Sequence, residues 1–152
     1  MLIAVDFLKY KDHLKIRRTE TERLEIYDIV RRKYIVLQPE EMVRQVVVQY
    51  LMLEKNYPLS KIRVEMGLTV NERQKRCDIL IFDNHFKPYL LVECKAATIP
   101  INQHTFEQIA HYNQVFQVPY LMVTNGLSTF CCKMTYDTEG VVFLENIPSL
   151  LP

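Results

Sequence analysis

The chain has 152 residues, 49% of them hydrophobic, and carries 19 Lys and Arg against 18 Asp and Glu, so its formal net charge is +1. This length and apolar content suit one domain with a hydrophobic core, and the balanced charge excludes a strong overall attraction to nucleic acid. Basic residues nevertheless gather at residues 9–11, 15–18, 31–33 and 73–76. Such clusters suit either a local phosphate-binding surface or ordinary solvated faces.

The composition argues against several classes of protein. Only three glycines are present, so neither a Walker-type phosphate loop nor a GxGxxG dinucleotide fingerprint is encoded, and a nucleotide-driven motor is not expected. No apolar run approaches the length of about 18 residues that suggests a membrane span, and residues 1–6 lack the basic flank of a signal peptide. The four cysteines show no CxxC spacing, which favours reduced thiols in a cytoplasmic protein over a zinc site.

Residues 1–35 mix charged with scattered apolar residues, and we expect an N-terminal extension there, ahead of a domain at residues 36–152. Within the extension, residues 22–34 fit either a short helix or an extended arm. The clearest helix opens at residues 38–41, with a proline in its first turn, and ends at residues 56–58. Its expected apolar face consists of Met42, Val46, Val47, Tyr50, Leu51 and Leu53.

The rest of the chain predicts strands and one more helix. In chain order, the elements are strands at 62–68, 77–83 and 89–96, a helix at 102–117 between two prolines, and strands at 120–124, 130–135 and 141–144. The first three strands suit a meander, and the helix before the fourth permits a crossover that makes this strand parallel to a neighbour. The sequence therefore predicts an α/β fold with a mixed β-sheet flanked by helices.

The most informative feature is a pair of acids in the expected hairpin of residues 77–96. If this hairpin is symmetric, Asp83 closes it opposite Pro88 and Asp78 lies directly across from Glu93. Two opposed carboxylates destabilise a sheet, so we expect something cationic between them. Lys95 shares a face with Glu93, because side chains alternate along a strand. Two acids and a lysine together predict a divalent-cation site with a charged helper.

Asp78, fourteen intervening residues and then Glu93-Cys94-Lys95, after a Glu-bearing helix, resemble the PD-(D/E)xK nuclease superfamily. More narrowly, residues 35–148 resemble the N-terminal nuclease domain of type I restriction enzyme R subunits. The segments that carry this resemblance are 39–45, 75–79, 91–96, Gln108 with Tyr112 and Asn113, and 124–126. The chain departs from the family in having Cys77 where proline is usual. We also expect no helicase motor and no specificity-subunit contacts, so restriction itself is not implied.

The resemblance implies a restriction-endonuclease-like fold and Mg²⁺-dependent hydrolysis of phosphodiester bonds in DNA, by an endonuclease or exonuclease, with Mn²⁺ as a substitute. Asp78 and Glu93 would hold the metal together with the backbone carbonyl of Cys94. Lys95 would position the attacking water or stabilise developing charge. Glu41 or Glu40 would be the helix-borne acid, with Glu41 preferred.

The resemblance gives Gln108 a role in orienting substrate or catalytic groups, and Tyr112 lies four residues further on the same helical face. The implied partners are DNA, other subunits of a defence or repair complex, and a second copy in a homodimer. No membrane is expected. Substrate form and the number of metal ions stay open.

Simpler interpretations stay open as well. Lys95 could bridge two exposed acids, Glu40 and Glu41 could serve only the helix dipole, and Gln108 could belong to a polar helix shoulder. Glu65 could approach the metal or face solvent, and Arg44 could contact phosphate or pair with a core acid. None of the histidines has metal-ligand spacing. The alternative function is a non-catalytic nucleic-acid-binding module of a defence or repair complex, and a second alternative is a structural domain with an ion-pair cluster.

Overall fold

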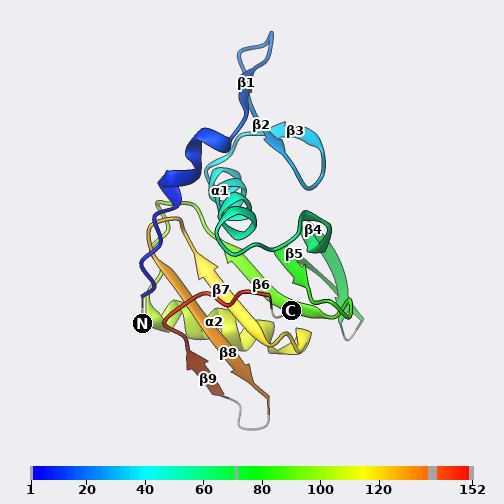
Figure 1. Ribbon diagram of the computed structural model, residues 1–152, viewed down its shortest axis with the longest axis vertical. Coiled ribbons are helices and arrows are strands. Elements are labelled where there is room, and N and C mark those ends of the chain that lie inside the picture. The colour runs from blue at the N-terminus through cyan, green and yellow to red at the C-terminus, as the bar shows by residue number, and fades with distance from the viewer. Residues whose placement is uncertain (1, 71, 137–139, 151–152) are drawn as a thin grey trace.

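The computed structural model describes residues 2–70, 72–136 and 140–150. A six-stranded mixed sheet forms the centre of the protein, and a smaller three-stranded sheet extends beyond α1 (Figure 1). The central sheet has the order β4-β5-β6-β7-β8-β9. The strands are β4 (Ile62–Val70), β5 (Arg73–Phe82), β6 (Pro88–Cys94), β7 (Tyr120–Thr124), β8 (Thr129–Thr135) and β9 (Gly140–Phe143).

The topology follows the sequence-based expectation. Strands β4, β5 and β6 form an antiparallel meander, and β7 is parallel to β6 after a crossover through α2 (Gln103–Asn113). Strands β8 and β9 continue antiparallel. This confirms the predicted α/β class with a mixed sheet between helices. Strand β5 begins four residues earlier than predicted, because β4 and β5 are both long and pair as far as Val70 and Arg73.

Helix α1 (Pro39–Leu53) begins and ends close to its predicted bounds, with Pro39 at its start and Glu40 and Glu41 in its first turn. Its apolar side packs on the sheet, where Val47 and Leu51 are fully buried. Leu53 was assigned to this side wrongly, since 48% of its surface is exposed at the end of the helix.

The second predicted helix is shorter than expected. It ends at Asn113, and a single 3₁₀ turn, η3 (Gln114–Phe116), follows it. Gln117 then adopts a left-handed backbone conformation with φ 53°. A helix cannot continue through such a residue, so the helical segment ends before its predicted bound.

The N-terminal segment contains a 3₁₀ helix and three strands. These are η1 (Phe7–His13), β1 (Ile16–Arg18), β2 (Leu24–Asp28) and β3 (Lys33–Val36). A further 3₁₀ turn, η2 (Leu59–Lys61), lies outside this segment, between α1 and β4. Of the two alternatives for residues 22–34, the extended one holds. Phe7 and Tyr10 pack their rings against Tyr50 of α1, with centroids 5.2 and 5.8 Å away, so the segment joins the main core.

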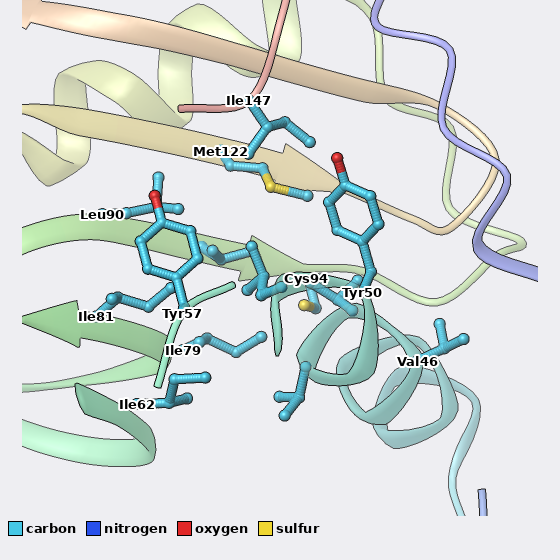
Figure 2. Packing of buried hydrophobic residues seen from close by; sticks show 14 of the residues in the cluster. Val46, Tyr50, Tyr57, Ile62, Ile79, Ile81, Leu90, Cys94, Met122 and Ile147 are labelled. Carbon is cyan, nitrogen blue, oxygen red and sulfur yellow. The ribbon is translucent and has the colours of Figure 1, made fainter. Parts of the chain in front are cut away.

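Hydrophobic clusters cover both faces of the central sheet. The larger one lies under α1 and includes Ile79, Leu90 and Met122 (Figure 2). The other lies under α2 and includes Leu80 and Leu121. Neighbouring residues of one strand, such as Ile79 and Leu80, belong to opposite clusters. The sheet is therefore buried on both faces, as expected for a sheet that lies between helices.

All four cysteines are buried and unbonded to one another. Within the described residues, no helix combines the length and apolar character needed to cross a membrane.

Candidate active site

The predicted pairing of the β5–β6 hairpin holds in its central part. The register pairs are Ile79 with Val92, Leu80 with Leu91 and Ile81 with Leu90. Asp78 and Glu93 directly follow the last of these pairs, Ile79 with Val92, and their carboxyl groups contact each other.

The predicted closing pair of the same hairpin is wrong. Pro88 pairs with Phe82 instead of Asp83, because the register shifts after Ile81. Asp83 stays outside the ladder, where its Oδ1 accepts hydrogen bonds from the backbone N–H groups of His85 at 2.8 Å and Lys87 at 3.0 Å. These bonds hold the turn together.

The strand alternation is interrupted where the acids lie. Cys77 packs in the cluster under α2, whereas Ile79 packs in the cluster under α1, although residues two apart in a regular strand share a face. On β4 the same change occurs between Val64 and Met66, and Glu65 between them has a φ of +53°. The side chains of Glu65 and Asp78 therefore lie where both strands change which face their residues occupy.

Arg44 is the centre of the charged network on the α1 side. Its side chain is 6% exposed, and it donates hydrogen bonds to Glu41 at 3.0 Å, to Asp78 Oδ1 at 3.1 Å, and to Glu65. Asp78 Oδ2 accepts a further bond from the Cys94 N–H at 2.7 Å. Both oxygens of Asp78 are therefore fixed, one by α1 and one by β6.

Glu93 lies beside this network. Burial raises the pKa of Glu93 to about 8, and the charge of Asp78 and a hydrogen bond with it act in the same direction, while Lys95 opposes them. Two such close carboxyl groups resist joint ionisation unless a cation neutralises them.

The two candidate acids of α1 have different surroundings. Glu41 accepts hydrogen bonds from Arg31 at 3.2 Å, Arg44 at 3.0 Å and Gln45 at 3.2 Å, so its carboxylate is fully engaged. Glu40 interacts electrostatically with the site instead. Burial and then the charge of Asp78 raise the pKa of Glu40, and Lys95 and Arg44 lower it. Of the two acids, Glu40, the less preferred one, is thus the one whose carboxyl group interacts electrostatically with Asp78 and Lys95.

A cavity of about 240 Å³ opens on the α2 side of the acids. It is lined by Arg76, Glu93, Lys95, Gln108, Ile109, Tyr112, Asn113 and Phe116. The structure thus brings Gln108 and Tyr112 of α2 into one cavity with Glu93 and Lys95. The Lys95 N–H donates to the Thr124 carbonyl at 2.9 Å, which extends the β6–β7 pairing past the end of β6.

The segment Thr124-Asn125-Gly126 has a structural role next to the cavity. Asn125 Oδ1 accepts bonds from the N–H groups of Leu127 and Ser128, and its Nδ2 donates to the Ile99 carbonyl at 2.8 Å. Asn125 therefore closes the β7–β8 turn and holds the loop that follows Lys95.

The possible metal ligands of the site are carboxylates and not histidines or thiols. Among the described residues, no group of three or more His, Cys, Asp and Glu side chains is arranged around a common metal position, and His85, His104 and His111 are exposed. Mg²⁺ needs only one or two carboxylates and keeps several waters. The carboxylate oxygens of Asp78 and Glu93 are donors of the type that this hard ion prefers.

Two charged residues of the site were not singled out as site residues from the sequence. Arg31 connects Glu41 to Asp28, and Arg76 lines the cavity with 74% of its side chain exposed. Arg76 carries a usable signal, since it lies two residues before Asp78 in a basic cluster. The other basic side chains of that cluster, Arg73 and Lys75, lie outside the described set.

Comparisons with known proteins identify a family and a similar fold. The family model for the type I restriction enzyme R protein N terminus matches residues 39–148. No curated protein matches the chain. Among solved structures, a fragment of a protein described as an HsdR subunit of a type I restriction enzyme from Vibrio vulnificus YJ016 has a similar fold. The TM-score is 0.52 at 22% identity, over 74% of this chain and 24% of that fragment.

The chain thus spans about a quarter of the fragment it resembles. The family match, however, covers well over half of the chain and includes α1, the acids of the hairpin, and α2. The chain belongs to the family of type I restriction enzyme R protein N-terminal domains.

Proposed function

We propose that this chain is a Mg²⁺-dependent nuclease that hydrolyses phosphodiester bonds in DNA, with Mn²⁺ able to replace Mg²⁺. The observation that carries the proposal is the contact between the Asp78 and Glu93 carboxyl groups, of which Glu93 lines a cavity together with Lys95 and Gln108. Such a pair suits an Mg²⁺ ion, which would acidify a bound water and neutralise charge on the scissile phosphate.

The side chains of the cavity and of the Arg44 network beside it would divide the remaining work. Asp78, fixed at both oxygens, and Glu93 with the Cys94 carbonyl would hold the metal. Lys95 would place its ammonium beside the attacking water or the phosphate oxygens, where charge develops. Glu40 rather than Glu41 would complete the polar shell, because the carboxyl group of Glu40 interacts electrostatically with both Asp78 and Lys95.

Two other residues that line the cavity, Gln108 and Arg76, would position the substrate. Gln108 on α2 would orient the substrate, and Arg76 would bind a phosphate next to the scissile one. Arg76 suits this task because its pairing with Glu65 is long, at 3.4 Å, and exposed, and exposed ion pairs stabilise little. Its guanidinium can therefore exchange partners at little cost.

We infer that DNA and further subunits of a restriction complex are the partners, by membership of the family, and that the protein acts in the cytoplasm. A non-catalytic DNA-binding module is the second candidate. It is favoured by one observation, namely that Arg44 already supplies a positive charge to Asp78.

The first experiment measures metal binding through stability, since the substrate form is not known. The thermal unfolding midpoint is recorded with and without Mg²⁺ or Mn²⁺ for the wild type, for Asp78→Asn and for Asp12→Asn, an exposed acid on η1. A metal that binds only the folded state adds about 2.7 kcal/mol when present at 100 times its dissociation constant. We expect stabilisation of the wild type and Asp12→Asn, and none of Asp78→Asn.

Cleavage of single-stranded and duplex DNA is then tested with the wild type, Asp78→Asn and Lys95→Ala. We expect hydrolysis by the wild type alone, while both variants keep the wild-type circular dichroism spectrum. Full cleavage by either variant contradicts the proposal. Metal-independent stability together with DNA binding but no hydrolysis supports the non-catalytic module.

A further inference from the structure

The three-stranded sheet β1–β2–β3 presents one face made of cations and tyrosines. Cross-strand pairing places Arg17 opposite Glu25 and Tyr27 opposite Tyr34, and paired residues share a face. Lys15 continues this face, because the Tyr27 N–H donates to its carbonyl at 2.8 Å. The buried residues of this sheet, Ile26 and Asp28, belong to the opposite face. We call the face with Lys15, Arg17, Tyr27 and Tyr34 the basic–aromatic face.

Each cation on this face is held over a ring. The Arg17 guanidinium carbon lies 3.8 Å from the centroid of Tyr34, and Lys15 Nζ lies 5.5 Å from that of Tyr27. The two rings are themselves packed, with centroids 5.2 Å apart. Glu25 pairs with Arg17 at 2.8 Å but is 17% exposed against 53% for Arg17, so the carboxylate lies deeper than the guanidinium. The outermost groups of the face are positive.

The local charge agrees with this arrangement. Residues 15–36 contain seven Lys and Arg against four Asp and Glu, a net charge of +3 in a chain of net charge +1. Three of the four acids are consumed in pairs with arginines of the same segment. Among the described residues, no ion pair involves Lys15, Arg23, Arg32 or Lys33, and all four are exposed.

A continuous series of ion pairs ties this sheet to the candidate active site. Arg31 contacts Asp28 of β2 at 2.6 Å and Glu41 of α1 at 3.2 Å, and Arg44 contacts both Glu41 and Asp78. In Figure 1 the small sheet extends beyond α1, the helix that contributes Arg44 to the contact with Asp78. The basic–aromatic face is therefore held in a fixed relation to the acids.

We propose that the basic–aromatic face is a second DNA-binding surface, which holds the sugar–phosphate backbone of the substrate away from the cleavage site. This inference rests on the proposed function, because it takes DNA as the substrate. Cations placed over aromatic rings suit phosphates, and an exposed guanidinium plane also suits stacking with a base. The net charge of +3 makes a polyanion the matching partner, and DNA is the polyanion that the adjacent site would process.

The test compares two double variants with the same change of charge. Lys15→Gln/Arg17→Gln alters the proposed surface, and Lys87→Gln/Lys133→Gln alters exposed lysines in the β5–β6 turn and on β8. DNA dissociation constants are measured for the full chain over a range of salt concentrations, with Ca²⁺ in place of Mg²⁺. A single variant, Lys15→Gln, keeps the Arg17–Glu25 pair and serves if the double variant is unstable.

We expect the first double variant to bind DNA about tenfold more weakly than the wild type. The slope of log binding constant against log salt concentration should also become shallower by up to about 2, since each phosphate contact contributes about 0.9 to this slope. Lys15→Gln should show about half of this change in slope, and the control should bind like the wild type. Equal effects in both double variants, or none in either while the wild type binds and cleaves DNA, overturn this inference alone.

Two other outcomes separate a failure of the proposed function from a failure of this inference alone. If the wild type binds no DNA under any condition, the proposed function fails and this inference fails with it. If polyglutamate displaces DNA as effectively as DNA of equal charge does, the face recognises an acidic protein partner and not DNA, and the inference is overturned.

Discussion

Arg44 is a buried cation surrounded by Glu41, Glu65 and Asp78. Removing one partner of a buried ion pair is costly, since the remaining charges lose their compensation without regaining water. The guanidinium is also what holds Asp78 Oδ1 in place. Arg44 thus determines both the stability of the region and the orientation of the candidate metal ligand.

We expect Arg44→Met to lower the free energy of unfolding by about 3–5 kcal/mol, because three partly buried carboxylates are left without their cation. Urea unfolding at neutral pH measures this. The control is Arg63→Met, an exposed arginine that donates to the carbonyls of Ser60 and Ile62, which should change stability by about 0.5 kcal/mol or less. If Arg44→Met lowers the free energy of unfolding by less than about 1 kcal/mol, the ion pairs of Arg44 do not stabilise the fold.

At this scale, the sequence predicts some side chains well and others poorly. The proximity of Asp78 and Glu93 could be predicted, because the register of the hairpin between Ile79 and Leu90 depends on residues close in the chain, although its closing pair was predicted wrongly. The choice between Glu40 and Glu41 could not, since it depends on where Arg31 and Arg44 reach from distant segments. Glu65 was also ambiguous, because its left-handed conformation breaks the alternation on which facing arguments rest.

Among the elements, α2 is the one that carries the second wall of the cavity. Asn102 caps its N-terminus, where its Oδ1 accepts from the Thr105 N–H at 2.9 Å. Asparagine is among the residues most favoured at this position, because the first N–H groups of a helix have no partner within the helix. The cap therefore supports the helical turn that precedes Gln108.

We expect Asn102→Ala to lower the free energy of unfolding by about 1 kcal/mol, the usual cost of losing a cap. His104→Ala, in the same exposed turn, should change it by about 0.5 kcal/mol or less. Chemical denaturation of the two variants side by side measures the difference. Equal stability of both variants would mean that the cap contributes nothing here.

Strands and α1 were predicted closely, because apolar runs and proline boundaries mark them within the sequence. The N-terminal strands were not resolved from a helix in advance. Their alternation is weak, since β1 is exposed throughout and β3 has no fully buried residue. What stabilises them is mutual pairing and the buried Ile26 and Asp28, which are properties of the assembled sheet.

In the molecule as a whole, the four cysteines are distributed over both core clusters. Complete burial raises the pKa of the Cys94 thiol, and burial raises the pKa values of Cys131 and Cys132 to about 12. The thiolate is the reactive form of cysteine, so both access and ionisation oppose modification.

We therefore expect none of the four thiols to react with a small disulfide reagent at pH 8 while the protein is folded, and all four to react once it is unfolded. Stopped-flow absorbance with and without guanidinium measures this. A thiol that reacts within seconds in the native protein would contradict the core arrangement described above.

The single parallel junction of the sheet has a consequence for the order of folding. The β5–β6 hairpin, with Asp78 and Glu93, is closed by a short turn, whereas β6 and β7 are separated by the 25 residues between Cys94 and Tyr120. Closing the longer segment costs more chain entropy before its contacts form. The two acids can therefore meet early in a local hairpin, and the cavity beside them is completed only when β7 docks.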